Sequence, residues 1–177
     1  MKKNQEQEIL SLLNTYSKAL KLLEQYDKNE LKIFKGKKSK FVLEYEDCLN
    51  IIFELRKQSI NKKEYGSLFG NEVGHKFESV VKNIYQTFNK KELYSSIGEK
   101  TANFLYLTVK DHPFSDGNKR IAAFLFIYFL NKSNSLYNTK KEKKISNNTL
   151  AALTLLIAES RPKEKDQMIG FITQLLK

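Results

Sequence analysis

Nine consecutive residues, His112 to Arg120 (His-Pro-Phe-Ser-Asp-Gly-Asn-Lys-Arg), carry an imidazole, a carboxylate, an amide, an ammonium and a guanidinium. This set suits the attack of a hydroxyl on a phosphate. The imidazole of His112 can remove a proton near neutral pH, and the carboxylate of Asp116 offers the hard oxygen that Mg²⁺ prefers. The cations of Lys119 and Arg120 can neutralise a polyphosphate, the arginine through two parallel hydrogen bonds.

The same residues also have a purely structural interpretation, in which His112 and Asp116 only satisfy backbone groups of a helix–loop–helix. Each residue taken singly fits that alternative. Five polar groups within nine residues, between two strongly apolar segments, favour a functional site instead. The loop should also bind anions, because the first N–H groups of a helix that follows a glycine-containing turn favour phosphate oxygens.

The segment before the motif predicts a helix that ends at the motif. Ser96 and Glu99 have the spacing of a capping box and should begin a helix that runs to about Lys110. Pro113 disfavours helical geometry at the preceding residue, so the chain should leave the helix at His112.

The segment after the motif predicts a second helix, from Gly117 to about Asn131. It is apolar on every side, which is typical of a buried central helix. We expect Ser115 or Asp116 to cap its first turn. Phe114 is most simply a hydrophobic anchor that fixes the loop between the two helices.

Apolar residues at three- and four-residue steps predict further amphipathic helices over residues 4–27, 43–57, 149–159 and 163–176. The lysine-rich residues 28–40 are typical of a solvated loop, and residues 132–148 of a mobile connection. Glycines in residues 62–74 indicate turns and allow a short hairpin. Residues 80–88 fit either a short helix or an extended piece.

Composition excludes several classes of protein. The chain has 177 residues, 41% of them apolar, which argues against disorder and predicts one domain over 1–177. Its parts are N-terminal helices (1–60), a motif-bearing core (68–131) and closing helices (149–177). The single Cys48 lies on an apolar helix face and excludes a disulfide framework. No apolar run of membrane-spanning length and no signal-peptide core occurs, so we expect a cytoplasmic protein.

The charge is strongly basic, with 31 Lys+Arg against 20 Asp+Glu and a net charge of +11. A non-catalytic nucleic-acid-binding module is therefore a second functional hypothesis, based on the clusters Lys28–Lys40 and Lys140–Lys144. Neither cluster carries the interleaved aromatic residues that nucleic-acid recognition would need. The first cluster is also a candidate phosphate-binding patch, and His75 is best explained as a polar surface residue.

The segment His112 to Arg120 resembles the signature of the Fic/Doc family, His-Pro-Phe-x-Asp/Glu-Gly-Asn-Gly/Lys-Arg, at every specified position. The setting is similar too, because the family's motif joins two core helices. Residues 68–130 look like the family core. Residues 149–176 are similar to the helices that close one subgroup with Lys in the motif, which includes virulence-associated Fic proteins.

The resemblance implies an all-α fold, here a Fic-type helical bundle with a buried central helix and a short β-hairpin flap. It implies transfer of AMP from ATP, with Mg²⁺, to a Ser, Thr or Tyr hydroxyl of a target protein. His112 would be the general base, Asp116 the Mg²⁺ ligand and Arg120 the partner of the β- and γ-phosphates. The nucleotide would bind to Ser115, Asp116, Gly117, Asn118, Lys119 and Arg120.

One position leaves the transferred group open. Many AMP-transferring members have Gly where this chain has Lys119, whereas Doc-type kinases have Lys, and a long cation there could turn the γ-phosphate toward the acceptor. The Doc-type motif, however, usually lacks the Pro113 and Gly117 found here. AMP transfer is therefore the first hypothesis and γ-phosphate transfer the alternative. A degenerate domain kept for interaction only is a further one.

The family docks its target as an extended strand on the flap, for which Gly70–Phe88 is the candidate, giving His75, Lys76 and Phe77 a second interpretation. Many members are inhibited by a helix bearing Ser/Thr-x-x-x-Glu, and Ser95–Glu99 and Ser160–Glu164 match this in part. A separate inhibitory protein, a homo-oligomer and export by a specialised secretion route remain open.

Overall fold

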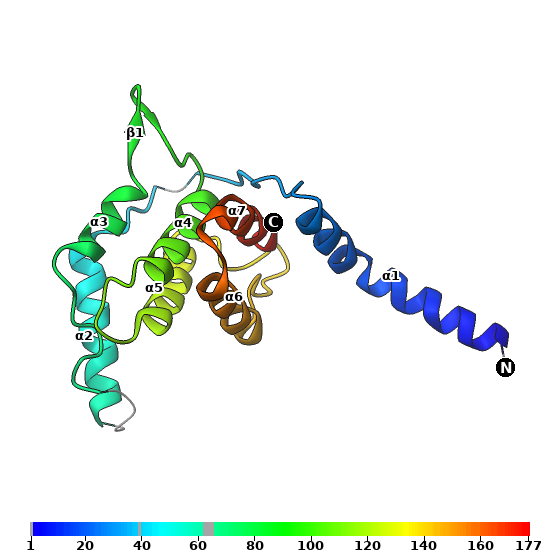
Figure 1. Ribbon diagram of the computed structural model, residues 1–177, viewed down its shortest axis with the longest axis horizontal. Helices are drawn as coiled ribbons and strands as arrows, with labels where there is room; N and C mark the ends of the chain where they lie inside the picture. The colour runs from blue at the N-terminus through cyan, green and yellow to red at the C-terminus, as the bar shows by residue number, and fades with distance from the viewer. Residues whose placement is uncertain (1, 39, 62–65) are drawn as a thin grey trace. The chain divides into compact units, whose positions relative to one another are not determined.

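The computed structural model describes residues 2–38, 40–61 and 66–177. The chain divides into two compact units, Met1–Lys32 and Ile33–Lys177. The described residues form seven α-helices, one 3₁₀ turn and one two-stranded antiparallel hairpin (Figure 1). The all-α class with a short β-hairpin, expected from the sequence, is therefore confirmed. The single-domain organisation stays a prediction.

The first unit contains helix α1 (Lys2–Asp27), close to the predicted range. Its apolar side chains recur at three- and four-residue steps and line a shallow groove along one face of the helix. They are Ile9, Leu12, Leu13, Tyr16 and Leu20.

The core of the second unit is the antiparallel pair of α4 (Ile97–Lys110) and α5 (Asn118–Lys132) (Figure 1). The side chain of Ser96 accepts a hydrogen bond from the Glu99 N–H, and the Glu99 carboxylate accepts one from the Ser96 N–H, which confirms the predicted capping box. α5 carries fully buried residues along its length, although Phe124 is 46% exposed.

The remaining helices pack around α4. They are α3 (Lys76–Asn83), α6 (Asn147–Glu159) and α7 (Lys165–Leu175), the last preceded by the 3₁₀ turn η1 (Pro162–Glu164). Helix α2 (Tyr45–Asn61) contributes the buried Cys48 and Ile52 to the same core. Cys48 is fully buried and is therefore a core residue, as expected, and this burial raises the pKa of its thiol to about 12.

The β-hairpin consists of β1 (Thr87–Phe88) and β2 (Lys91–Glu92), and it extends away from the helices of the second unit (Figure 1). It begins where the predicted flap range ends. Eight residues of that range form α3 instead, because Phe77, Val80 and Val81 all point into the core.

The connection over residues 132–148 differs from the mobile segment that the sequence suggested. Leu136 and Ile145 are buried, and the Lys144 N–H donates to the Leu136 carbonyl at 2.9 Å. These two apolar side chains fix the segment to the core. Its many lysines had led to the prediction of a mobile connection. None of the described helices has both the length and the hydropathy that a membrane span requires.

Candidate active site

The motif begins where α4 stops. The helix ends at Lys110 with Asp111 as its C-cap, and His112 takes a left-handed backbone conformation with φ of +45°. This confirms that the chain leaves the helix at His112. A histidine in this region costs roughly 1 kcal/mol, and the surrounding contacts must hold it there. The His112 side chain is exposed to solvent.

The motif backbone is held by the chain between α2 and α3. Gly70 donates its N–H to the Asp116 carbonyl at 3.0 Å, and Val73 donates to the Pro113 carbonyl at 2.8 Å. In the opposite direction the Ser115 N–H donates to the Asn71 carbonyl at 2.8 Å. These hydrogen bonds run along both sides of Phe114 and leave the loop little freedom. A hairpin within residues 62–74 was the alternative from sequence, and the described residues 66–74 pair with the motif instead.

Phe114 anchors the loop in the core, as predicted. Its side chain is 2% exposed, and its ring centroid lies 4.8 Å from that of Phe77. The Asn118 side chain holds the same residue from both sides. Its Oδ1 accepts from the Phe114 N–H at 2.8 Å, and its Nδ2 donates to the Phe114 carbonyl at 2.7 Å. Asn118 therefore positions the loop through its amide group.

Gly117 caps α5, with a left-handed φ of +88° and no side-chain cap. The expectation that Ser115 or Asp116 would cap this helix is wrong. A Cβ at Gly117 would overlap the ring of Phe69, so the position needs glycine for both its backbone conformation and its space. The ring of Phe69 lies directly against the turn and excludes other residues there.

The Asp116 carboxylate bonds within the loop instead of capping the helix. Its Oδ1 accepts the Gly117 N–H at 2.6 Å, and the Arg120 guanidinium lies 3.2 Å from both carboxylate oxygens. Both side chains are about half exposed, at 45% each. The guanidinium carbon also lies 5.0 Å from the centroid of the Phe69 ring. The structure thus brings together the carboxylate and the guanidinium that the sequence singled out.

His112 and Lys119 present exposed side chains at this loop. In the described part of the chain neither side chain forms a hydrogen bond or an ion pair. Asp111, next to His112, has its pKa raised by burial, while the nearby cations Lys165 and Lys76 act in the opposite direction. The candidate base therefore stands at an open surface beside a carboxyl group whose pKa lies above its usual value.

A residue that sequence reasoning missed is Glu72. Its carboxylate accepts hydrogen bonds from the N–H groups of Phe77 and Glu78, at 2.8 and 3.2 Å, and from the Tyr45 hydroxyl at 2.5 Å. The bond to Glu72 raises the pKa of Tyr45. Because Glu72 also pairs through its backbone with Phe114, it links the start of α3 to the motif. A glutamate just ahead of a short helix was the available sequence signal.

The two candidate inhibitory glutamates have other partners. Glu99 lies at the start of α4, eleven residues and roughly 17 Å along the helix from Lys110. Its carboxylate accepts hydrogen bonds from the N–H and hydroxyl groups of Ser95 and Ser96. Glu164 accepts from the Arg161 N–H at 2.6 Å and pairs with its guanidinium at 2.8 Å.

The residues around the candidate flap separate into exposed and buried ones. His75 is 88% exposed, with its Nδ1 3.4 Å from a carboxylate oxygen of Glu78, in agreement with a polar surface residue. Phe77 is fully buried against Phe114, so its alternative assignment to target docking is wrong.

Comparison with protein families matches residues 43–130 to the Fic/DOC family. The chain contains a Fic/DOC family domain. The matched range covers α2 to most of α5 and includes the whole motif and the segment that holds it. Comparisons with curated proteins and with solved structures gave no match. Members of this family are typically transferases that use Mg-ATP.

Proposed function

We propose that this Fic domain transfers AMP from ATP to a hydroxyl group of a target protein. The observation that carries the proposal is the motif loop itself. Its backbone is fixed from both sides by residues 70–73 and Asn118, while His112, Asp116, Lys119 and Arg120 remain at the surface. A fixed loop with accessible chemical groups is the arrangement that phosphate positioning requires, because it reduces the reorganisation needed during the reaction.

The residues divide the reaction between them. His112 takes the proton from the acceptor hydroxyl, whose oxygen then attacks the α-phosphorus of ATP. The bond between the α- and β-phosphates breaks and pyrophosphate leaves. Arg120 and Lys119 neutralise the charge on the leaving phosphates, and the N–H groups at the start of α5 bind phosphate oxygens. The N–H groups of Ser115 and Gly117 donate to Asn71 and Asp116 instead.

The residues present fit a Mg²⁺ ion bound together with the nucleotide. Asp116 offers a half-exposed carboxylate beside cations that recruit the phosphates, and Mg²⁺ usually takes one or two carboxylates plus phosphate oxygens. Among the described residues no three His, Cys, Asp or Glu side chains converge on a site of their own. When bound, the ion would neutralise charge on the phosphates and orient them.

Lys119 supports one alternative, transfer of the γ-phosphate. It lies in the first turn of α5 with an exposed ammonium, next to the residues that would bind the nucleotide. A cation at this position can attract the β- and γ-phosphates and reverse the nucleotide, so that the γ-phosphorus faces His112.

Labelling with two forms of ATP tests the proposal. We expect Mg²⁺-dependent labelling of the protein itself or of a lysate target with α-³²P-ATP, and none with γ-³²P-ATP. His112→Ala should lose the signal, whereas His75→Ala removes the other histidine and should retain it. Labelling from γ-³²P-ATP alone would establish the kinase alternative. Equal labelling by the wild type and His112→Ala would refute the role of His112.

A further inference from the structure

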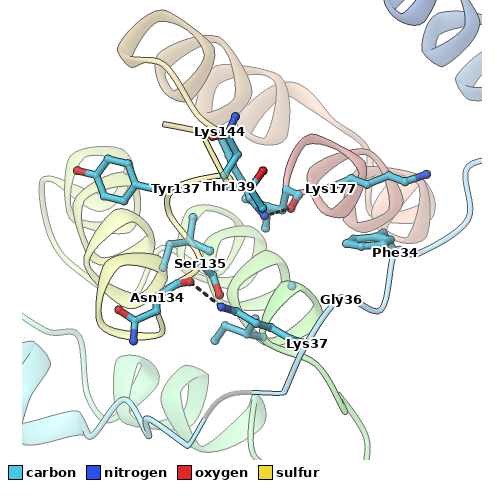
Figure 2. A pocket seen from close by; sticks show the side chains of 14 residues that line it. Phe34, Gly36, Lys37, Asn134, Ser135, Tyr137, Thr139, Lys144 and Lys177 are labelled. Carbon is cyan, nitrogen blue, oxygen red and sulfur yellow. Dashed lines mark hydrogen bonds between the residues drawn. The ribbon is translucent and has the colours of Figure 1, made fainter. Parts of the chain in front are cut away.

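A hollow lies at the end of the α4–α5 pair that is opposite to the motif. It is about 610 Å³ in volume and is formed by the chain around Phe34, the start of α4, the end of α5 and the end of α7 (Figure 2). The segment 134–144 completes it. Pockets of roughly 300–1,000 Å³ are the size in which proteins bind small molecules.

The walls of this pocket are held by hydrogen bonds between distant parts of the second unit. The Phe34 N–H donates to the Thr173 hydroxyl on α7 at 3.0 Å, and the Ile97 N–H donates to the Lys37 carbonyl at 3.0 Å. The buried side chains of Ile97, Leu130 and Leu176 close the base of the pocket, and the half-buried ring of Phe34 lines it above them. The pocket is therefore a built cavity with an apolar base.

The rim of the pocket is positively charged. Lys37, Lys144 and Lys177 line it, and none of its lining residues is acidic. The ammonium of Lys37 donates to the Asn134 carbonyl and that of Lys144 to the Leu176 carbonyl, each at 2.7 Å (Figure 2). Within the part of the chain that the structure describes, none of these three ammoniums forms an ion pair with a carboxylate.

Capping of helix ends explains only part of this arrangement. The two carbonyls follow the ends of α5 and α7, where a cation is favourable. Each ammonium has three N–H donors, and the described residues provide one acceptor to each. Burial and the charge of Lys37 together lower the pKa of Lys144, so the two cations concentrate charge that a bound anion would neutralise.

We propose that this pocket binds a small organic anion, with its apolar body against the half-buried ring of Phe34 and its negative group between Lys37 and Lys144. A purely apolar ligand would leave the lysines without a counter-charge. A free inorganic anion would leave the ring of Phe34 in contact with water. Both features together select a molecule that is apolar at one end and anionic at the other.

The probe pair 8-anilinonaphthalene-1-sulfonate and N-phenyl-1-naphthylamine tests this directly, because the second has a closely similar ring system without the sulfonate. We expect the sulfonate probe to bind one-to-one to the full chain, with amide NMR shifts in residues 134–144 and Gly98. Binding should weaken as salt is added. The uncharged probe should bind more weakly and should show no dependence on salt.

Substitutions separate the charge from the cavity. Lys37→Met and Lys144→Met should each raise the Kd of the sulfonate probe about tenfold, the loss expected for one charge-assisted contact. Neither should change the Kd of the uncharged probe. Lys163→Met removes an exposed lysine on η1 and is the charge-matched control, with no change expected. Thr139→Trp at the exposed rim should block both probes.

Each outcome decides the proposal, provided that thermal unfolding shows every variant to be folded. Unchanged sulfonate affinity in the double variant Lys37→Met/Lys144→Met would overturn it. So would NMR shifts confined to the apolar face of α1, which would show that the probe binds to exposed apolar side chains there. Equal affinity for both probes would reduce the pocket to an apolar cavity without anion selectivity.

Discussion

The two ends of the α4–α5 pair are built in opposite ways. At the motif end the side chain of Phe114 enters the core and fills the space beneath the loop, and residues 70–73 pair with the loop backbone. Only polar side chains of the loop reach solvent. At the pocket end a hollow remains above the buried apolar side chains, and three lysines line it. The comparison teaches that one helix pair can hold reactive groups in a fixed geometry at one end and form a ligand-sized pocket at the other.

The largest expected effect tests how strongly the motif depends on the core. Phe114→Ala should lower the free energy of unfolding by about 3–5 kcal/mol, because it removes a buried ring and leaves a cavity. Phe124→Ala on α5, where the ring is 46% exposed, should cost less than about half of that. Urea unfolding measures both. Similar losses for the two variants would show that the motif loop is not part of the core.

A smaller loss should follow from crowding the turn of the motif. Gly117→Ala combines a left-handed backbone with overlap of the Phe69 ring and should cost about 2–4 kcal/mol. Gly74→Ala is the matched control, because its φ is +63° and no atom lies within 4 Å of an added Cβ. It should cost only about 1 kcal/mol. Differential scanning calorimetry of both variants isolates the contact with Phe69.

At the pocket end the decisive local contact is the capping box of α4. Ser96→Ala should cost about 1 kcal/mol, because the Glu99 N–H loses its acceptor at the start of the helix. Ser79→Ala, within α3 and exposed, should stay within about 0.5 kcal/mol of the wild type. A loss in Ser96→Ala as large as that in Phe114→Ala would contradict the difference between the two ends.

The smallest effect concerns Asp111, beside His112. Burial raises its pKa, so the folded state disfavours the ionised form and loses stability at neutral pH. Asp111→Asn should therefore give a small rise in Tm at pH 7. The gain should fade toward about pH 3, where the aspartic acid is protonated in both folded and unfolded states. A gain that is constant between these two pH values would refute the assignment to ionisation.

The sequence predicted the parts of the fold that depend on neighbours along the chain. The capping box of α4 and the end of the helix at His112 were correct, because spacing and proline geometry act over a few residues. The burial of Phe114 followed from its place between two apolar helices.

What the sequence did not predict depends on contacts between distant residues. The pairing of residues 70–73 with the motif uses backbone groups, which leave no pattern of side chains to recognise. Asp116 was expected at a helix cap, but the Arg120 side chain and the Gly117 N–H bind it instead. The pocket of Lys37 and Lys144 joins segments that are more than a hundred residues apart and was therefore invisible.

The pairing of Gly70 with Asp116 also sets when the motif takes shape during folding. These hydrogen bonds close a loop of about 45 residues, whose entropy must be offset before the contacts can form. Amide protons of Gly70 and Ser115 should therefore exchange with solvent together, as members of one cooperative unit. The motif is contiguous in sequence, yet we expect it to take its final geometry only when residues 70–73 pair with it.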